Sequence, residues 1–304
     1  MVTNGQVEAS MRTDQGRVRD HNEDFVAYYE PTDPEEELNN GWLYIVADGV
    51  GGADAGEVAS QYATERTLHH YLKDDETGDW GKRLVQAMRT ANTELREMVS
   101  RQPQKLHMAT TMVATVFHNS KATLANVGDS RGYHWRDGNL LQVTKDQSLV
   151  ARLLEEGAIT EEEASKHPRR NVILHSLGSE KDPKIDLYDV DIAAGELLIL
   201  CSDGLTRHVS DEEISEIVGL EPPGEATSTL IRLANERGGE DNISVAVLHY
   251  GEQSAQMKAT ASSVKLVTGE RIRVESRKTL WVYTAILCVI QTLLIVLVWY
   301  LIVA

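Results

Sequence analysis

The sequence predicts an α+β domain of antiparallel sheets with helices packed outside them, followed by one helix that spans a membrane. Two observations predict the domain. The hydrophobic period switches repeatedly between two and about 3.6 within residues 1–250. Strand-like runs cluster with short connections, and the long helix-like runs come as a pair, which favours antiparallel sheets over an alternating parallel fold. The third observation is an apolar stretch at residues 280–303.

Each expected element follows from local patterning. Apolar runs or period-two alternation predict strands at Trp42–Ala47, Thr111–Phe117, Ala122–Val127, Gly132–Trp135, Leu140–Val143, Glu196–Cys201 and Ile243–His249. Helical spacing predicts helices at Gly56–Leu72, Lys82–Val99, Asp211–Val218 and Glu225–Glu236. Ser210 and Glu213 form a capping box at the start of the third helix. No internal repeat interrupts residues 1–250.

Composition excludes several classes of protein. The 304 residues are 41% hydrophobic, which is enough for a large core and argues against disorder. The net charge is −17, and because residues 251–304 carry six Lys/Arg against three Asp/Glu, residues 1–250 carry about −20. We expect no nucleic-acid binding, because such a domain repels phosphate backbones. With only Cys201 and Cys288, the chain cannot build a disulfide framework or a thiolate metal site, and a reducing compartment fits.

The C-terminal apolar stretch predicts a transmembrane helix. Leu280–Val303 contains 24 residues without a charge, where about 20 suffice to cross a bilayer. A buried core helix is the alternative, but this stretch has no polar face. The basic residues before it predict a cytoplasmic domain; they are Arg271, Arg273, Arg277 and Lys278. The N-terminal residues show no secretory signal. The expected organisation is a domain at 1–250, a polar linker at 251–279 and a membrane helix at 280–303.

Acidic residues recur at the ends of apolar runs, several of them beside a glycine. They are Glu23, Asp24, Asp48, Asp129, Asp203 and Asp241. Clustered carboxylates repel one another unless cations lie between them, so convergence of these residues predicts a site for Mg²⁺ or Mn²⁺. The alternative for any single Asp-Gly pair is a hairpin turn, which we expect at Asp137-Gly138 because alternating strands flank it on both sides.

Five motifs of this kind follow one another within residues 6–250. They are Arg19-Asp20-His21-Asn22-Glu23-Asp24, Ala47-Asp48-Gly49-Val50-Gly51-Gly52, Asn126-Val127-Gly128-Asp129-Ser130-Arg131, Ser202-Asp203-Gly204-Leu205 and Gly239-Glu240-Asp241-Asn242-Ile243. In order and spacing they resemble the motifs of the type 2C metal-dependent serine/threonine protein phosphatases, and most closely those of the bacterial branch. The resemblance implies an α-β-β-α sandwich with a two-metal centre between its sheets.

The resemblance also implies a role for each acidic residue. Asp48 would bridge two Mn²⁺ or Mg²⁺ ions, Gly49 would lend its carbonyl oxygen, and Asp203 and Asp241 would complete one ion. Two cations of this kind activate a shared water for in-line attack on phosphorus, without a covalent intermediate.

The remaining motif residues would serve the second ion and the substrate. Glu23 and Asp24 would hold the second metal or its waters, and Asp129 resembles the ligand of a third, weaker metal. Arg19 would bind the substrate phosphate, because its planar fork can contact two oxygens at once.

Two positions depart from the family pattern. Val50 stands where animal members carry a histidine thought to protonate the leaving group, a role we assign to metal-bound water. Ala109-Thr110-Thr111 replaces the family's Gly-Thr-Thr, which we interpret as a packing change. Ser202 lies beside Asp203 without a G-x-S-x-G motif, so we expect backbone support from it and not nucleophilic attack.

The segment Ser148–Ser179 corresponds to a mobile flap of the family. It contains one suggestive basic group, made of His167, Arg169, Arg170 and His175. Solvated loop charge is the simpler interpretation of this group, and contact with a phosphopeptide is the alternative.

The sequence therefore predicts a membrane-held phosphatase that removes phosphate from phosphoserine and phosphothreonine in phosphoproteins and opposes a serine/threonine kinase. The rival hypothesis is a non-catalytic, membrane-tethered scaffold that binds phosphoproteins with the same fold. The complete set of predicted metal carboxylates disfavours the scaffold.

Overall fold

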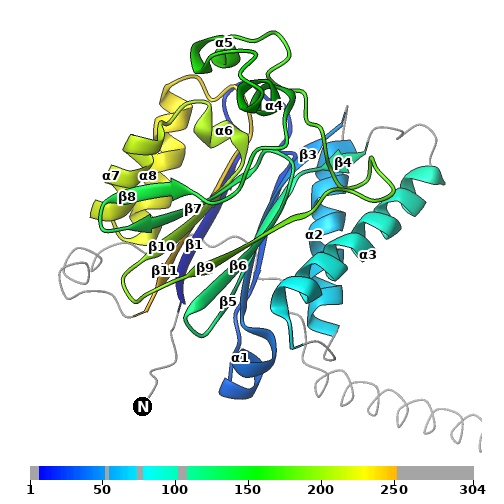
Figure 1. Cartoon of the computed structure of the whole chain (residues 1–304), viewed down its shortest axis with the longest axis vertical. Helices are drawn as coiled ribbons and strands as arrows, with labels where there is room; N and C mark the ends of the chain where they lie inside the picture. The colour runs from blue at the N-terminus through cyan, green and yellow to red at the C-terminus, as the bar shows by residue number, and fades with distance from the viewer. Residues whose placement is uncertain (1–6, 52–54, 74–77, 102–107, 252–304) are drawn as a thin grey trace, which may run out of the picture. The chain divides into compact units, whose positions relative to one another are not determined.

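A computed structural model describes residues 7–51, 55–73, 78–101 and 108–251 (Figure 1). They form two stacked β-sheets with helices on the outer face of each, so the predicted α+β class and the α-β-β-α layering are confirmed. The predicted linker, from residue 252 onwards, and the predicted membrane helix lie outside these residues. Within the described ranges, no helix is both long and apolar enough to cross a membrane.

The first sheet has the strand order β1-β11-β10-β7-β8, and each pairing is antiparallel. Its strands are β1 (Val7–Asp14), β7 (Arg131–Arg136), β8 (Asn139–Gln142), β10 (Leu197–Cys201) and β11 (Ile243–Tyr250). Each of these strands except β1 matches a predicted strand to within about one residue at either end. Asp137 and Gly138 both have positive φ, at 50° and 81°, between β7 and β8, so the predicted hairpin turn is confirmed.

The second sheet has the order β2-β3-β5-β6-β9, and the short β4 also pairs with β3. Its strands are β2 (Asp24–Tyr29), β3 (Trp42–Val50), β4 (Ala109–Thr110), β5 (Met112–His118), β6 (Lys121–Val127) and β9 (Asp186–Asp191). The strand predicted at Trp42–Ala47 corresponds to β3, and its predicted end at Ala47 was wrong. β3 continues to Val50 because Gly49 and Val50 pair with β4, so Asp48 lies within a strand and not after one.

Four long helices cover the outer faces, as predicted. They are α2 (Ala55–Lys73), α3 (Trp80–Ser100), α7 (Asp211–Leu220) and α8 (Pro223–Glu236). The capping box of α7 is confirmed, because the Ser210 hydroxyl accepts from Glu213 N and the Glu213 carboxylate accepts from Ser210 N. The sequence did not predict four shorter helices, α1 (Pro34–Asn40), α4 (Leu149–Glu155), α5 (Glu161–Ser165) and α6 (Asp203–Thr206).

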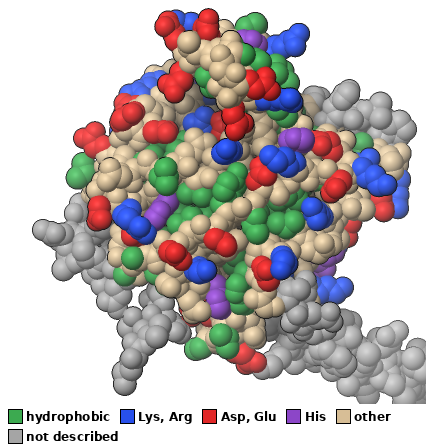
Figure 2. All heavy atoms as spheres, in the orientation of Figure 1, with side chains coloured by type: hydrophobic (Ala, Val, Ile, Leu, Met, Phe, Trp, Pro, Cys, Tyr) green, Lys and Arg blue, Asp and Glu red, His purple; other side chains and the backbone are tan. Residues whose placement is uncertain are grey.

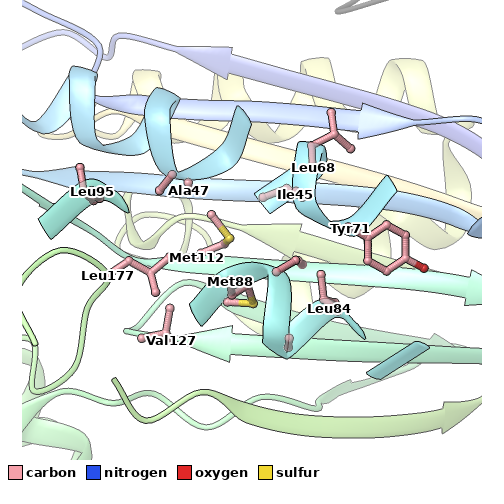
Figure 3. Packing of buried hydrophobic residues seen from close by; sticks show 14 of the residues in the cluster. Ile45, Ala47, Leu68, Tyr71, Leu84, Met88, Leu95, Met112, Val127 and Leu177 are labelled. Atoms are coloured by element: carbon pink, nitrogen blue, oxygen red, sulfur yellow. The ribbon is translucent and has the colours of Figure 1, made fainter. Parts of the chain in front are cut away.

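Three hydrophobic clusters hold the layers together. One lies between the second sheet and the α2/α3 pair, and Figure 3 shows part of it, with Met88 and Leu95 of α3 facing Ala47, Met112 and Val127 of the sheet. A second joins the first sheet to α7 and α8, and a third lies between the two sheets. Since Ala47 is anchored in this core, the next residue along β3 is held at a fixed place.

The visible surface carries charges of both signs. Figure 2 shows acidic and basic side chains interspersed around a more hydrophobic central region of this face. Two of the exposed large hydrophobic residues belong to the edge strands of the two sheets, Leu141 of β8 and Leu187 of β9.

Candidate metal centre

Asp48 lies two residues before the end of β3, where backbone and threonine contacts hold it. Its carbonyl oxygen accepts hydrogen bonds from Thr110 Oγ1 and Thr111 N, both at 2.9 Å. Its N–H donates to Thr111 Oγ1 at 3.2 Å. The segment Ala109-Thr110-Thr111 thus supplies both hydroxyls that position the predicted bridging residue, while Ala109 only pairs with Val50 in β4.

Asp24 starts β2 directly opposite Asp48 in the antiparallel register. Its side chain is 5% exposed, and Oδ2 accepts a 2.7 Å hydrogen bond from Ser202 Oγ. The same hydroxyl accepts from Ser244 N at 2.9 Å. Ser202 therefore accepts from a backbone N–H, which agrees with the predicted backbone support, and it also donates to a carboxylate, which the sequence did not predict.

Asp203 and Asp241 come from neighbouring strands of the first sheet. Asp203 begins α6 immediately after β10, and Asp241 lies two residues before β11, which pairs with β10. At Gly204 a Cβ atom would lie 2.0 Å from the carbonyl oxygen of Asn242. A glycine is required there because the start of α6 approaches the loop before β11 so closely.

Glu23 is held by the side-chain amide of Asn242, the residue that follows Asp241 in the chain. Asn242 Oδ1 accepts from Glu23 N at 2.8 Å, and Nδ2 donates to the carbonyls of Gln15 and His21 at 2.8 and 2.9 Å. Gly49 N also donates to Glu23 O at 3.0 Å. One asparagine thereby joins the Arg19-to-Asp24 motif to the Asp241 motif.

Asp129 follows β6 after a glycine with φ of 98°, and its side chain is 7% exposed. The next residue, Ser130, shares a 2.7 Å hydrogen bond with the hydroxyl of Thr111. Thr111 therefore links the Asp48 and Asp129 segments.

The carboxylates act on one another electrostatically. Desolvation raises the pKa of Asp48 well above its usual value, and the charges of Asp24, Asp203, Asp129 and Asp241 raise it further. Burial raises the pKa of Asp24 to about 7, with smaller contributions from the charges of Asp203 and Asp241. Burial likewise raises the pKa of Asp129 to about 7, with smaller contributions from the charges of Asp203 and Asp146. Five of the six predicted acidic residues thus repel one another, and the sixth, Glu23, is repelled by Asp241. Burial also raises the pKa of Glu23, and the charge of Asp241 adds to this shift.

The donor set fits a hard divalent cation. Within the described part of the chain, four buried carboxylate oxygens lack any hydrogen-bond partner, and three of them belong to this cluster: Asp24 Oδ1, Asp129 Oδ1 and Asp203 Oδ1. Unpaired buried charge is costly, and oxygen-bound cations offset that cost. Among the described residues, however, no three Asp, Glu, His or Cys side chains lie in positions from which they could coordinate one metal ion together.

Two arginines form ion pairs with this cluster. Arg19 Nη2 lies 2.7 Å from Asp241 Oδ1, and Arg19 remains 44% exposed. Sequence reasoning missed the second, Arg207, whose Nη1 donates to Asp241 Oδ2 at 2.9 Å and whose Nη2 donates to Asp203 Oδ2. The available signal was its position four residues after Asp203, within reach of that carboxylate on a helical turn.

The Ser148–Ser179 segment contains α4 and α5, drawn above α6 in Figure 1. His175 Nδ1 lies 3.1 Å from both carboxylate oxygens of Glu180, and His167 Nδ1 accepts from Arg169 N at 3.1 Å. Both histidines of the basic group thus have partners close by in sequence, which favours the simpler interpretation of that group.

A family model described as protein phosphatase 2C matches residues 20–241. The chain belongs to the protein phosphatase 2C family. All the predicted acidic site residues, Glu23 to Asp241, fall inside the matched range, and Arg19 lies one residue before it.

Curated relatives of this phosphatase 2C chain include the serine/threonine protein phosphatase PstP of Mycobacterium tuberculosis, 41% identical over 238 residues that make up 78% of this chain and 43% of PstP. The chain thus spans less than half the length of that relative. The serine/threonine phosphatase stp of Listeria monocytogenes is 38% identical over 80% of this chain and 95% of stp. Among solved structures, the catalytic domain of PstP in complex with two manganese ions is 37% identical, with a TM-score of 0.69, and covers 82% of this chain and all of that one.

Proposed function

We propose that this chain hydrolyses phosphoserine and phosphothreonine residues of phosphoproteins with two bound Mn²⁺ or Mg²⁺ ions. The observation that carries the proposal is the gathering of Asp24, Asp48, Asp129, Asp203 and Asp241 into one electrostatic cluster from separate strand ends. Relatives named as serine/threonine phosphatases, one of them solved with two manganese ions, support the reaction and the cofactor.

Each residue of the site has a defined task in this proposal. Asp48 would serve both ions, and the Gly49 carbonyl, Asp203 and Asp241 would complete one of them. Glu23 and Asp24 would hold the second ion or its waters, and Asp129 would serve a weaker third site. When bound, the ions activate water and neutralise charge on the phosphate.

The substrate phosphate would contact the exposed side chain of Arg19 at the edge of the acidic cluster. Arg19 is 44% exposed beside Asp241, and in this proposal its guanidinium binds and orients phosphate oxygens. Ser202 and Asn242 keep Asp24 and Glu23 in place through the hydrogen bonds described above. Val50, whose side chain is exposed, offers no proton to the leaving group.

The setting of the reaction is a further part of the proposal. The 24 uncharged residues at 280–303 support a single membrane helix, and the basic residues before it support a cytoplasmic domain. A phosphatase held there would oppose a serine/threonine kinase acting on the same phosphoproteins.

Phosphate release tests the activity. Purified full-length protein should hydrolyse p-nitrophenyl phosphate and phosphoserine or phosphothreonine peptides with Mn²⁺, stop when a chelator is added, and recover when Mn²⁺ is returned. Phosphopeptide binding without phosphate release at any Mn²⁺ or Mg²⁺ concentration would support the non-catalytic scaffold and overturn the enzyme.

A further inference from the structure

Arg207 lies among the acidic side chains of the metal centre, although no motif of the sequence analysis contains it. It follows α6, whose first residue is Asp203. Its two terminal nitrogens contact different carboxylates, Asp241 Oδ2 at 2.9 Å and Asp203 Oδ2. Its side chain is only 22% exposed, so the contact is largely shielded from water.

The guanidinium also faces the rest of the cluster. The charge of Arg207 lowers the pKa of Asp129, although burial raises it overall, and the charge of Asp48 is among those that raise the pKa of Arg207. A single positive charge therefore interacts with four carboxylates that come from β3, the loop after β6, the start of α6 and the loop before β11.

The pair of contacts leaves little of Asp241 free. Its Oδ2 atom binds Arg207, while its Oδ1 atom binds Arg19 at 2.7 Å and accepts from Asn242 N at 3.0 Å. A divalent cation needs lone pairs on the same oxygens. Arg207 and a metal ion thus compete for Asp241 Oδ2 and Asp203 Oδ2, whereas Asp203 Oδ1 has no hydrogen-bond partner among the described residues.

We propose that Arg207 is an internal counter-cation that stabilises the metal-free site and has to leave Asp203 and Asp241 before they can bind a metal ion. This inference rests on the proposed two-metal function and concerns the regulation of that site. Its consequence is a weaker apparent affinity for metal, because only the fraction of molecules with Arg207 displaced is competent to bind.

A second acid–arginine pair with the same i,i+4 spacing shows how solvent exposure changes the strength of such a contact. Arg232 and Glu236 of α8 form an i,i+4 pair at 2.9 Å, yet their side chains are 61% and 57% exposed. Such surface pairs contribute little, since water screens them. Arg207 sits on the same spacing beside shielded carboxylates, where removing a positive charge has a large effect.

Calorimetric titration of the chelator-treated full-length protein with Mn²⁺ tests the inference. The variants are Arg207→Gln, which removes the charge, and Arg207→Lys, which keeps the charge without the two-pronged contact; Arg232→Gln is the matched control. We expect Arg207→Gln to bind Mn²⁺ roughly tenfold more tightly than wild type. Arg207→Lys should fall between them, and Arg232→Gln should match wild type.

Thermal unfolding provides a second readout that does not depend on activity. In chelator, Arg207→Gln should unfold at a lower temperature than wild type, and saturating Mn²⁺ should reduce the gap. A merely structural arginine would lower stability equally with and without Mn²⁺ and would leave Mn²⁺ affinity unchanged or weaker. That result, with wild type still binding Mn²⁺, would overturn the inference alone. Wild-type protein that binds no Mn²⁺ would overturn both the inference and the proposed function.

Discussion

Ser202 Oγ donates a 2.7 Å hydrogen bond to Asp24 Oδ2 and so joins the two sheets at the metal centre. Ser202 follows β10 of the first sheet, and Asp24 begins β2 of the second. The hydroxyl is fully buried and also accepts from Ser244 N. One small side chain thus satisfies a backbone donor and a carboxylate oxygen whose neighbour, Oδ1, has no hydrogen-bond partner in the described residues.

Removing this hydroxyl should destabilise the metal-free domain. Ser202→Ala removes a hydrogen bond to a buried carboxylate oxygen and the acceptor of a buried N–H, so the free energy of unfolding in chelator should fall by about 1–3 kcal/mol. Urea titration followed by circular dichroism measures it. Ser228→Ala, which removes a local hydroxyl contact to Gly224 O on α8, is the control and should change little. Equal stability of both variants would show that the bond between the sheets contributes nothing.

The strand that carries Asp48 shows what sequence patterns can and cannot predict. β3 was predictable because Trp42 to Ala47 form a continuous apolar run buried between the helices and the other sheet. Its last residues were not, since the pairing of Gly49 with Thr110 is a long-range contact with no local signal. β9 was missed because alternating aspartates make it look like a loop, although Leu187, Val190 and their neighbours pair with β6.

The metal centre also contains residues that the sequence predicted and residues that it did not. The motifs named Asp48, Asp203 and Asp241, and the fold brings these residues together with Asp24 and Asp129. The roles of Asn242 and Arg207 depend on loops that meet only after folding. An arginine four residues after an aspartate is common on helices, so its place among four carboxylates could not be predicted from spacing alone.

Neutralising Asp48 should abolish the reaction and leave the fold intact. Asp48→Asn removes the predicted bridging carboxylate, so turnover with Mn²⁺ should fall by orders of magnitude. Its stability in chelator should not fall, because the carboxylate is repelled by Asp24 and Asp203. Asp137→Asn, at the β7–β8 turn, is the control and should keep wild-type turnover. A folded Asp48→Asn protein that still hydrolyses phosphopeptides at the wild-type rate would contradict the two-metal mechanism.

Arg19 should act on substrate binding more than on turnover. Arg19→Ala removes an exposed guanidinium beside Asp241, so we expect KM for a phosphopeptide to rise about tenfold with kcat less affected. Steady-state kinetics at saturating Mn²⁺ separate the two constants. Arg17→Ala, in the same loop and also exposed, is the control. Loss of Mn²⁺ binding with an unchanged KM would instead assign Arg19 to the structure of the site.

The pair Glu213–Arg237 should make stability depend on pH. Two hydrogen bonds from Arg237, at 2.6 and 2.5 Å, together with the capping-box contact to Ser210, lower the pKa of Glu213 to about 2. A lowered pKa means that the stabilisation is complete above the ordinary value near 4.5 and is lost as pH falls toward 2.

Comparison of wild type with Glu213→Gln checks that dependence. The difference in urea midpoint should be constant between pH 7 and about 5 and should shrink below the ordinary glutamate pKa. Glu212→Gln, the exposed neighbour, controls for general loss of charge. A difference that grows on acidification would contradict the sign of this linkage.

The catalytic domain should function without the predicted membrane segment. β11 ends at Tyr250, whose N–H donates to Glu196 O at 2.9 Å and whose carbonyl accepts from Gly195 N at 2.8 Å, so the last strand is secured before residue 251. Cutting after Ser254 removes neither contact, and the truncated protein should be soluble and as active toward phosphopeptides as the whole chain. The full-length protein, as the matched control, should stay with membranes through carbonate extraction, as about 20 or more apolar residues in lipid would require.

Protease added outside intact cells should leave the domain whole, because the basic residues at 271–278 predict a cytoplasmic domain. A truncated protein that remained in the membrane fraction would show that something other than residues 280–303 anchors the chain, and digestion by external protease would reverse the predicted orientation.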